Sequence, residues 1–591
     1  MNLIGNINAI PFRRFRGGGG VAPIPPFPSI PGMIARYSAL GLTNEQMAAN
    51  PVWVDKTGNG HDLQMKNFAW SGMSGVGGYV QNFNDFRNNT TVDKVRIDEQ
   101  SSNSVKVTIL ATGINNAIYI PKNIYQFNKS YFIKISSEGY NEGDLSLLFY
   151  ALSTSTATTV KVPLNPNGIT EIPAIKEDDF LAVYLNVGGK VGSITIEQLP
   201  LYPGALVFDG VDDYGTCNNF PILTKEKGYT VVALRQWITR GEIAQGLVSN
   251  VKNWLKDGAF LLEYRNIQAD HLNKPISFGA IGSEMDLPHI LTYQTSKSCN
   301  GVSITTGNFE GTDVLHVGKL APTNVGTCIN AAIWELVFLD HDATEEELTK
   351  IKDYFVKTYP WLFPDQAWTV TGKTNEDEDR ATIANITGNG NNLVLSNFSF
   401  AEGSGYNEQG EYAGYLVTDG VDDKIESKQP FQLPIKFSMI GSWVFIKKED
   451  KRAGISKENN LIVYDKITGL TLFLNSVESY EEIDIDSFHA ISSDGKLYDE
   501  NWNMLPITVG SLLSDSSTLK IAYDGNNFVQ FAFNCMGFYD KILKKDDLLK
   551  GWIYLKGLKA QRIPPSKNYI LKEDGGYVLQ EDGNKILTEQ Q

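Results

Sequence analysis

The stretch Phe208-Asp209-Gly210-Val211-Asp212-Asp213 returns almost unchanged as Thr418-Asp419-Gly420-Val421-Asp422-Asp423. Shorter elements precede both copies in the same order: Thr57-Gly58-Asn59-Gly60 and Asn67-Phe68 before the first, Thr387-Gly388-Asn389-Gly390 and Asn397-Phe398 before the second. Short runs that recur in one order indicate a duplicated unit. The chain of 591 residues therefore contains two related domains, as its length also allows.

The spacing inside the two copies differs. Asp419 follows Phe398 by 21 residues, whereas Asp209 follows Phe68 by 141. The excess of about 120 residues is the size of a small domain. A separate module is therefore inserted into the first copy, at residues 81–203.

The predicted elements are mostly strands. Val105, Val107 and Ile109 alternate with polar residues, which is typical of a sheet with one buried face. Gly, Asn and Asp turns separate the short apolar runs elsewhere, a pattern typical of β-sandwiches. A helix closes each copy; Thr344 and Glu347 form a capping box for the first. The second helix is predicted at about 545–559.

We expect an all-β chain of five parts. These are an extended anchor arm (1–33), a first jelly roll split over 34–80 and 204–363, an inserted β-sandwich (81–203), a second jelly roll (364–562) and a tail of β-hairpin repeats (563–591). The tail carries an eight-residue repeat, Tyr569–Gly576 followed by Tyr577–Asn584, with Asp-Gly turns that predict tight hairpins. So short a tail should pair with another copy or pack on the body.

Composition excludes several classes of protein. A net charge of −16 argues against a general nucleic-acid-binding surface. No apolar run is long enough to cross a membrane, and the N-terminus lacks a secretory signal. Four scattered cysteines, Cys217, Cys299, Cys328 and Cys535, form neither a disulfide framework nor a zinc site. The absence of a disulfide pattern in the sequence therefore indicates synthesis in a reducing cytoplasm.

The N-terminal arm differs from the rest of the chain. Arg13, Arg14 and Arg16 precede four glycines and a proline-rich stretch, so the segment should be extended. Either it is a disordered leader, or it orders when it binds another protein. In the second case Ile10, Phe12 and Phe15 are the apolar anchors, and the arginines meet an acidic patch on the partner.

The repeated elements resemble laminin-G-like modules of the concanavalin A-like jelly-roll superfamily. The arrangement of arm, modules and short Glu-Asp-Gly tail repeats is similar to structural proteins of tailed phages that infect gut Bacteroidetes, including crAss-like phages. This resemblance implies a head fibre, tail fibre or other appendage on the virion surface, with the head favoured over the tail as its position, made in the cytoplasm of the host bacterium. It implies a capsid or other virion protein as partner of the arm, and by analogy with phage fibres a homotrimer.

The Asp-Gly-Val-Asp-Asp turns allow two interpretations. Their carboxylates could bind calcium, which prefers oxygen ligands. Alternatively the aspartates accept backbone hydrogen bonds within a turn and glycine supplies a positive φ. A calcium site needs more oxygens than the turn provides, so we predict no metal and no cofactor.

One segment suggests catalysis. Glu482-Ile483-Asp484-Ile485-Asp486 resembles the catalytic strand of retaining glucanases on the same superfold, which would make Glu482 the nucleophile and Asp486 the acid/base. Asp486 is shorter than the expected Glu, and the alternative is an exposed acidic strand. The chain shows no other catalytic motif. We expect a protein that is not an enzyme.

Glycan binding is the remaining chemical hypothesis. Trp254 and Trp502 are large apolar residues in polar surroundings, which suits a sugar site on a sandwich rim. The alternative for each is a tryptophan that faces the core. Together with this hypothesis, the resemblance to phage structural proteins implies a capsid-docked head fibre or surface appendage that displays lectin-like domains and adheres weakly to cell-surface or mucin glycans through many copies. The alternatives are a tail-fibre adhesin and a glycoside hydrolase.

Overall fold

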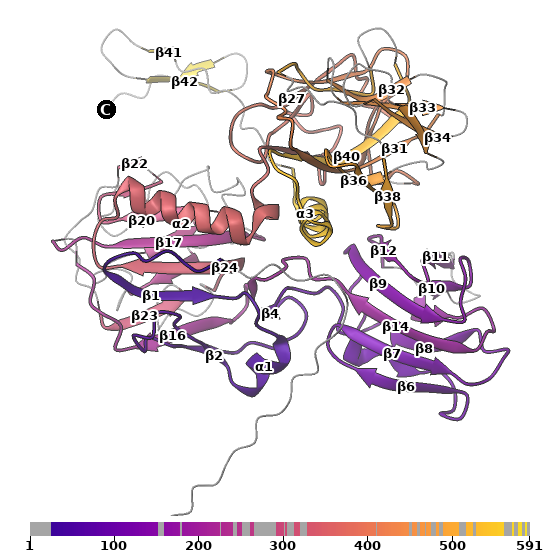
Figure 1. Cartoon of the computed structure of the whole chain (residues 1–591), viewed down its shortest axis with the longest axis horizontal. Helices are drawn as coiled ribbons and strands as arrows, with labels where there is room; N and C mark the ends of the chain where they lie inside the picture. Colours follow the sequence, from indigo (N-terminus) through magenta and orange to yellow (C-terminus); the bar gives the residue numbers. More distant parts are fainter. Residues whose placement is uncertain are drawn as a thin grey trace, which may run out of the picture.

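The chain folds into antiparallel β-sheets, as the computed structural model shows (Figure 1). The structure describes residues 25–560 except 152–158, 178–179, 225, 240–244, 251–260, 265–290, 301, 304–311, 320–327, 409, 448–451, 458–460, 467–468, 474–479, 484–487, 508–515 and 524–527, and it describes three short strands beyond residue 560. The prediction of an all-β fold is confirmed. Among the described helices, none is long and apolar enough to cross a membrane.

The first sandwich contains two sheets. One runs through β22 (Val302–Ser303), β21 (Ser298–Cys299), β20 (Leu291–Thr295), β17 (Thr230–Trp237), β24 (Asn330–Leu339), β15 (Leu206–Asp209) and β4 (Gly75–Val76), and β1 (Met33–Ser38) also pairs with β24. The other runs through β19 (Leu261–Tyr264), β18 (Gln245–Ser249), β23 (Val314–Val317), β16 (Tyr214–Asn218), β3 (Leu63–Lys66) and β2 (Val52–Trp53).

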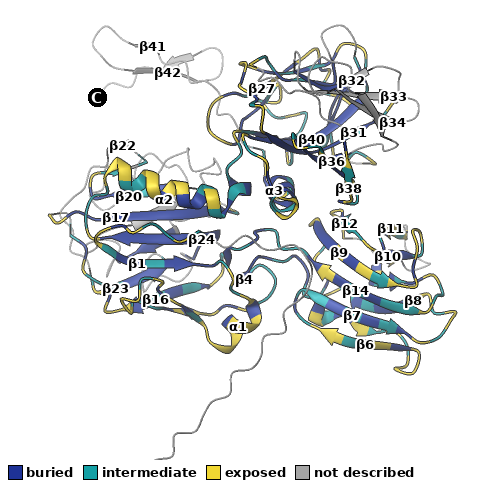
Figure 2. Cartoon of the chain, in the orientation of Figure 1, coloured by how far each residue is buried: buried dark blue, intermediate teal, exposed yellow. Residues whose placement is uncertain are grey.

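Strand β24 is buried on both faces. Ile333 and Phe338 belong to the core between the sheets. Trp334 and Val337 belong to a second cluster that includes Phe355 of α2 (Glu345–Thr358), the helix above this sheet in Figure 2. A strand covered on both sides needs apolar residues on both faces, which explains its nearly continuous apolar run.

The helices begin close to the predicted residues. The Thr344 hydroxyl accepts a hydrogen bond from the Glu347 backbone N–H (3.3 Å), and the Glu347 carboxylate accepts one from the Thr344 N–H (2.9 Å). The predicted capping box is therefore confirmed. Helix α3 (Lys545–Gly557) matches the second predicted helix. A short helix, α1 (Asn44–Ala49), precedes β2 and was not predicted.

The insert is a sandwich with its own core. One sheet runs through β11 (Val160–Leu164), β10 (Leu145–Ala151), β13 (Phe180–Asn186), β8 (Asn116–Pro121) and β5 (Arg87–Asn88); the other through β12 (Ile169–Ile172), β9 (Tyr131–Glu138), β14 (Gly192–Gln198), β7 (Ser104–Ile109) and β6 (Val95–Gln100). A short 3-10 helix, η1 (Phe83–Asp85), precedes β5. Val105, Val107 and Ile109 point into this core, as their alternation predicts.

The second sandwich repeats the plan of the first. One sheet runs through β28 (Gly405–Asn407), β29 (Tyr415–Val417), β40 (Phe531–Tyr539), β31 (Ser438–Phe445), β36 (Phe488–Ser492), β37 (Lys496–Asp499) and β38 (Met504–Pro506), and β25 (Gln366–Thr369) also pairs with β40. The other runs through β26 (Thr382–Ile383), β27 (Leu393–Ser396), β30 (Lys424–Ser427), β39 (Lys520–Ile521), β32 (Arg452–Lys457), β33 (Leu461–Lys466), β34 (Gly469–Phe473) and β35 (Tyr480–Ile483). In the tail β42 (Tyr577–Glu581) pairs with β41 (Ile570–Leu571) and β43 (Lys585–Leu587).

The insert enters the first sandwich at a hairpin. In the second sandwich β28 and β29 pair directly and residues 408–414 connect them. In the first, β4 and β15 pair in the same way, with Val76 opposite Leu206, but the whole insert lies between them. The ends of the inserted module are thus held side by side, which allows a domain to be inserted without breaking the host sheet.

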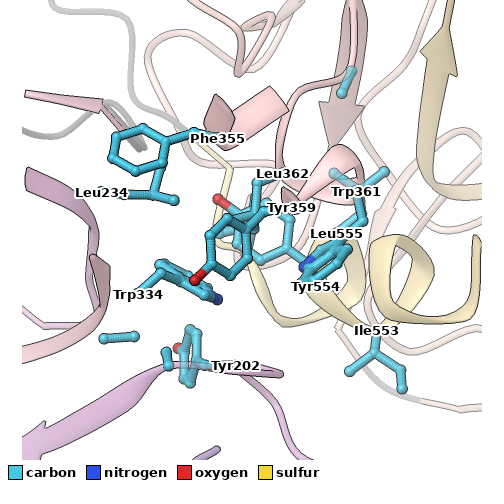
Figure 3. Close-up of a cluster of buried hydrophobic side chains, with 14 of the residues drawn as sticks. Tyr202, Leu234, Trp334, Phe355, Tyr359, Trp361, Leu362, Ile553, Tyr554 and Leu555 are labelled. Carbon is cyan, nitrogen blue, oxygen red and sulfur yellow. The ribbon is translucent and has the colours of Figure 1, made fainter. Parts of the chain in front are cut away.

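Helix α3 lies where the three sandwiches meet (Figures 1 and 3). The Tyr554 hydroxyl donates a hydrogen bond to Gln236 of the first sandwich (3.0 Å), and Lys556 pairs with Glu171 of the insert (3.1 Å). Trp552 meets Phe132 of the insert edge to face, with ring centroids 4.8 Å apart. The short helix η4 (Pro360–Leu362) adds Trp361 and Leu362 to the same cluster. This junction fixes the modules against one another through buried side chains.

Candidate functional site

The repeated aspartate turns form matching internal networks. Asp213 accepts hydrogen bonds from the Ser74 hydroxyl (2.9 Å) and the Asp209 N–H (3.0 Å). In the second copy Asp423 accepts them from Ser404 (3.0 Å) and the Asp419 N–H (2.8 Å). The acidic groups of each turn lie within 4.8 Å of one another, but the buried carboxylate of each is already used by the fold. The motif is thus explained by turn structure, the second of its two interpretations.

Burial, followed by the charge of Asp209, raises the pKa of Asp213 to about 7. The folded state therefore binds a proton at a higher pH than the unfolded chain does, so this group stabilises the fold more as pH falls from about 7 toward about 4. In Asp213→Asn this contribution should disappear, while the smaller one of Asp423, whose pKa burial raises to about 6, remains. The expected difference is on the order of 2 kcal/mol in the free energy of unfolding between about pH 5 and about pH 8, measured by urea denaturation.

Asp212→Asn is the matched control for this measurement, because Asp212 lies in the same turn but is exposed. It should retain the pH dependence of the parent chain. An Asp213→Asn protein whose stability still rises at low pH as the parent's does would contradict the assigned role of this carboxylate.

Most of the predicted site residues lie outside the described residues. These are Ile10, Phe12, Arg13, Arg14, Phe15 and Arg16 of the arm, and Trp254. In the glucanase-like segment Glu482 falls on β35, at the edge of its sheet, while Asp484 and Asp486 are also outside. Of the predicted site residues, the structure therefore places the side chain of Trp502 alone.

Trp502 lies in the turn after β37. The Asp499 carboxylate accepts hydrogen bonds from the backbone N–H groups of Asn501 (2.9 Å) and Asn503 (2.7 Å), which closes the turn. Trp502 adopts a positive φ of 61°, so its ring turns away from its polar neighbours and toward α3. It meets the Trp552 ring edge to face at 5.7 Å and is only 1% exposed. Its faces are thus covered by protein, as the core-facing alternative requires.

A pocket of about 600 Å³ lies beside this ring, between the insert and the second sandwich. The insert contributes residues 140–143, 163–167 and 169–171, and the second sandwich contributes residues 500–503, His489 and Trp552 of α3. Trp502 lines the pocket, and within the described part of the chain its indole N–H has no hydrogen-bond partner. A buried donor without a partner in the protein is rare in native proteins and is satisfied by a group from outside the chain, such as a water or a ligand oxygen.

The lining of the pocket is rich in amides and carboxylates. They are Asn141, Glu142, Asn165, Asn167 and Glu171 from the insert, and Glu500, Asn501 and Asn503 from the second sandwich. The side-chain amides of Asn141 and Asn501 have no hydrogen-bond partner among the described residues, whereas Asn503 donates to Asp499. Two free amides thus face the pocket from opposite modules.

The electrostatics of the pocket disfavour anions. Burial lowers the pKa of Lys556, but the Glu171 carboxylate outweighs that effect and the net shift is upward, so this pair stays ionised. Burial lowers the pKa of His489 to about 3, so its ring is neutral at physiological pH. Glu142 and Glu500 add two further carboxylates to the lining. A neutral ligand with several hydroxyl groups fits this chemistry best.

The sequence indicated only the wall of this pocket that the second sandwich provides. The run Glu500-Asn501-Trp502-Asn503 was predicted as a possible glycan site, but the loops of the insert were not predicted to take part. Asn165-Pro166-Asn167 has the composition of a turn, and nothing in it predicts contact with residues more than 300 positions later.

No protein-family model and no curated protein matches the sequence. Among solved structures the chain is similar to Trypanosoma rangeli sialidase in complex with sialic acid, at 10% identity and a TM-score of 0.23, over 79% of this chain and 85% of the sialidase. It is also similar to the binding domain of Botulinum neurotoxin serotype D, at 12% identity and a TM-score of 0.22, over 58% of this chain and 90% of that domain. At such TM-scores neither likeness carries weight for the function.

Proposed function

We propose that this chain is a non-catalytic, glycan-binding structural protein of a virion surface. The observation that carries the glycan-binding part is the pocket between the insert and the second sandwich, with its free amides and the unpaired indole N–H of Trp502. Its volume falls in the range of small-molecule sites, about 300–1,000 Å³. It also lies at a contact between modules, where binding sites are common.

The ligand of this pocket is a neutral sugar. Sugar hydroxyls both donate and accept, so they match a lining that offers amide N–H groups, amide oxygens and carboxylates. The acidic groups on the lining repel a ligand of the same sign. Trp502 acts through its N–H rather than as an exposed stacking ring.

The virion part of the proposal rests on the sequence. The Arg-, Gly- and Pro-rich arm and the tail repeats resemble phage structural proteins, and the arm would dock on a capsid or other virion protein as an extended segment. The globular part would then project outward as a homotrimer, where many weak sites give useful avidity. The competing candidate is a tail-fibre adhesin, which differs in its place on the particle.

The non-catalytic part of the proposal rests on the sequence, which shows no catalytic motif besides the glucanase-like segment. The carboxylates of Glu142, Glu171 and Glu500 on the pocket lining serve in this proposal as acceptors for sugar hydroxyls. Release of reducing sugar from a bound glycan, lost in Glu482→Gln, would favour the glycoside hydrolase instead.

The double variant Asn141→Ala, Asn501→Ala tests the pocket. Each lost hydrogen bond is worth about 0.5–1.5 kcal/mol, so together they should weaken binding of neutral oligosaccharides by between about fivefold and about 150-fold. A neutral glycan array identifies the ligand, and calorimetry then measures the affinity of both proteins. The exposed amide Gln429, which does not line the pocket, supplies the matched control Gln429→Ala.

The control should bind as the parent chain does. Absence of neutral glycan binding, or binding that the double variant leaves intact, would overturn the assignment of this pocket.

A further inference from the structure

The outward face of one sheet in the insert carries a row of aromatic residues. The register places Leu148 of β10 beside Tyr184 of β13, and Tyr184 beside Tyr119 of β8. On the outer strands Lys161 lies opposite Leu148 and Arg87 lies opposite Tyr119. One row therefore crosses the described sheet from a lysine to an arginine, with two tyrosines between them. We call these five residues, together with Tyr150, the tyrosine face.

The tyrosine face is accessible. Phe149, Val183 and Ile118, the sequence neighbours of its residues, point into the core of the insert. Lys161 and Arg87 are exposed and the three residues between them are half-buried. Tyr150, one step along β10 on the same side, is 43% exposed. The face thus presents apolar rings to solvent without any described element covering them.

The three tyrosines form one contact group. The rings of Tyr119 and Tyr184 have centroids 5.7 Å apart and planes inclined by 34°, and Tyr150 meets Tyr184 edge to face at 6.1 Å. None of the three phenol hydroxyls has a hydrogen-bond partner in the described part of the chain. Rings that are braced by one another but keep free hydroxyls provide a rigid amphipathic platform for a ligand.

The charge of this sheet is opposite to that of the chain. The protein has 68 acidic and 52 basic residues, yet none of the residues in β5, β8, β10, β11 and β13 is Asp or Glu. The other sheet of the insert carries acidic residues on β6, β9, β12 and β14. Arg87 and Lys161 have no ion-pair partner among the described residues. The tyrosine face is therefore a local basic surface on an acidic protein, which favours an anionic ligand.

We propose that the tyrosine face binds an acidic oligosaccharide, with sugar rings on the tyrosines and carboxylate or sulfate groups near Arg87 and Lys161. Strands lie about 4.8 Å apart, so four steps separate the two cations by about 19 Å, which requires a short chain of sugars rather than a single one. This extends the glycan-binding proposal but rests on a different surface from the pocket.

The test uses the full chain and hyaluronan tetrasaccharide, with chondroitin sulfate tetrasaccharide as a sulfated probe. The double variant Arg87→Gln, Lys161→Gln keeps the aliphatic stems and the fold, and Tyr184→Ala removes the central ring. Each should weaken binding of the acidic probes at least about tenfold, and binding by the parent chain should weaken with added salt. Lys106→Gln, at a half-buried lysine on the other sheet of the insert, should bind as the parent does.

The pocket variant Asn141→Ala, Asn501→Ala should also keep its affinity for the acidic probes. Failure of both acidic probes to bind, or binding that survives both face variants, would overturn the inference while leaving the neutral-glycan pocket untouched. Acidic binding that is lost in the pocket variant would assign it to the pocket instead. A change in oligomeric state in the face variants, without acidic binding, would identify the face as a protein interface.

Discussion

Trp552→Ala is expected to lower the free energy of unfolding of the second sandwich by about 3–5 kcal/mol, the usual loss when a buried aromatic side chain is truncated. Trp552 is 2% exposed and its indole N–H donates a hydrogen bond to the Gly441 carbonyl of β31 (2.9 Å). The same ring contacts Phe132 of the insert and His489. The substitution should therefore loosen the contact between modules as well as the sandwich itself.

Guanidinium denaturation followed by tryptophan fluorescence measures the loss of stability. Since the chain has several modules, its unfolding need not be a single transition, and the variant should unfold in more separated steps than the parent chain. Lys559→Ala, at an exposed position just after α3, is the control and should change stability by less than about 0.5 kcal/mol. A Trp552→Ala protein as stable as this control would show that the junction does not hold the modules together.

Deletion of residues 1–24 is expected to abolish incorporation of the protein into particles, by at least about a hundredfold. The deletion ends at residue 24 rather than at residue 33 because the contacts between this segment and the first sandwich begin before residue 33. Phe27 meets the Tyr354 ring edge to face at 4.7 Å and lies under the Arg36 guanidinium, and Ile30 is 5% exposed. A deletion through residue 33 would remove these contacts and the start of β1, so loss of attachment could not be separated from damage to the fold.

Quantitative mass spectrometry of purified particles measures incorporation, and density at the head or at the tail distinguishes a head fibre from a tail adhesin. Replacing Arg13, Arg14 and Arg16 with lysine should preserve much of the incorporation, whereas replacing them with glutamine should reduce it. Unchanged incorporation of the truncated protein, with normal thermal stability, would contradict an anchoring role for the arm.

The all-β fold could be predicted from the sequence because its signals are local. The alternation at Val105, Val107 and Ile109 indicates which side of a strand is buried, and the Thr344 capping box indicates where a helix begins. The repeated aspartate turns form matching hydrogen-bond networks, and in each turn the bond from the Asp209 or Asp419 N–H joins residues only four positions apart.

The candidate site could be predicted only in part, because its signals are not local. Trp502 stands between Asn501 and Asn503, and such neighbours suggest exposure. Its burial depends on a positive φ and on the ring of Trp552, which belongs to a helix fifty residues later. The opposite wall of the pocket comes from the insert, and no pattern in either segment encodes how two modules pack.

The hairpin at which the insert joins the first sandwich has a counterpart that carries no module. Residues 408–414 connect β28 to β29 where the first copy holds a complete domain between β4 and β15. The surrounding chemistry is the same, since Asn44 accepts a hydrogen bond from the Val76 N–H (2.7 Å) and Asn375 accepts one from the Tyr406 N–H (2.8 Å). The same hairpin position thus carries a complete domain in one copy and a short connection in the other. A second binding module inserted between β28 and β29 would therefore give a chain with two such modules, one in each sandwich.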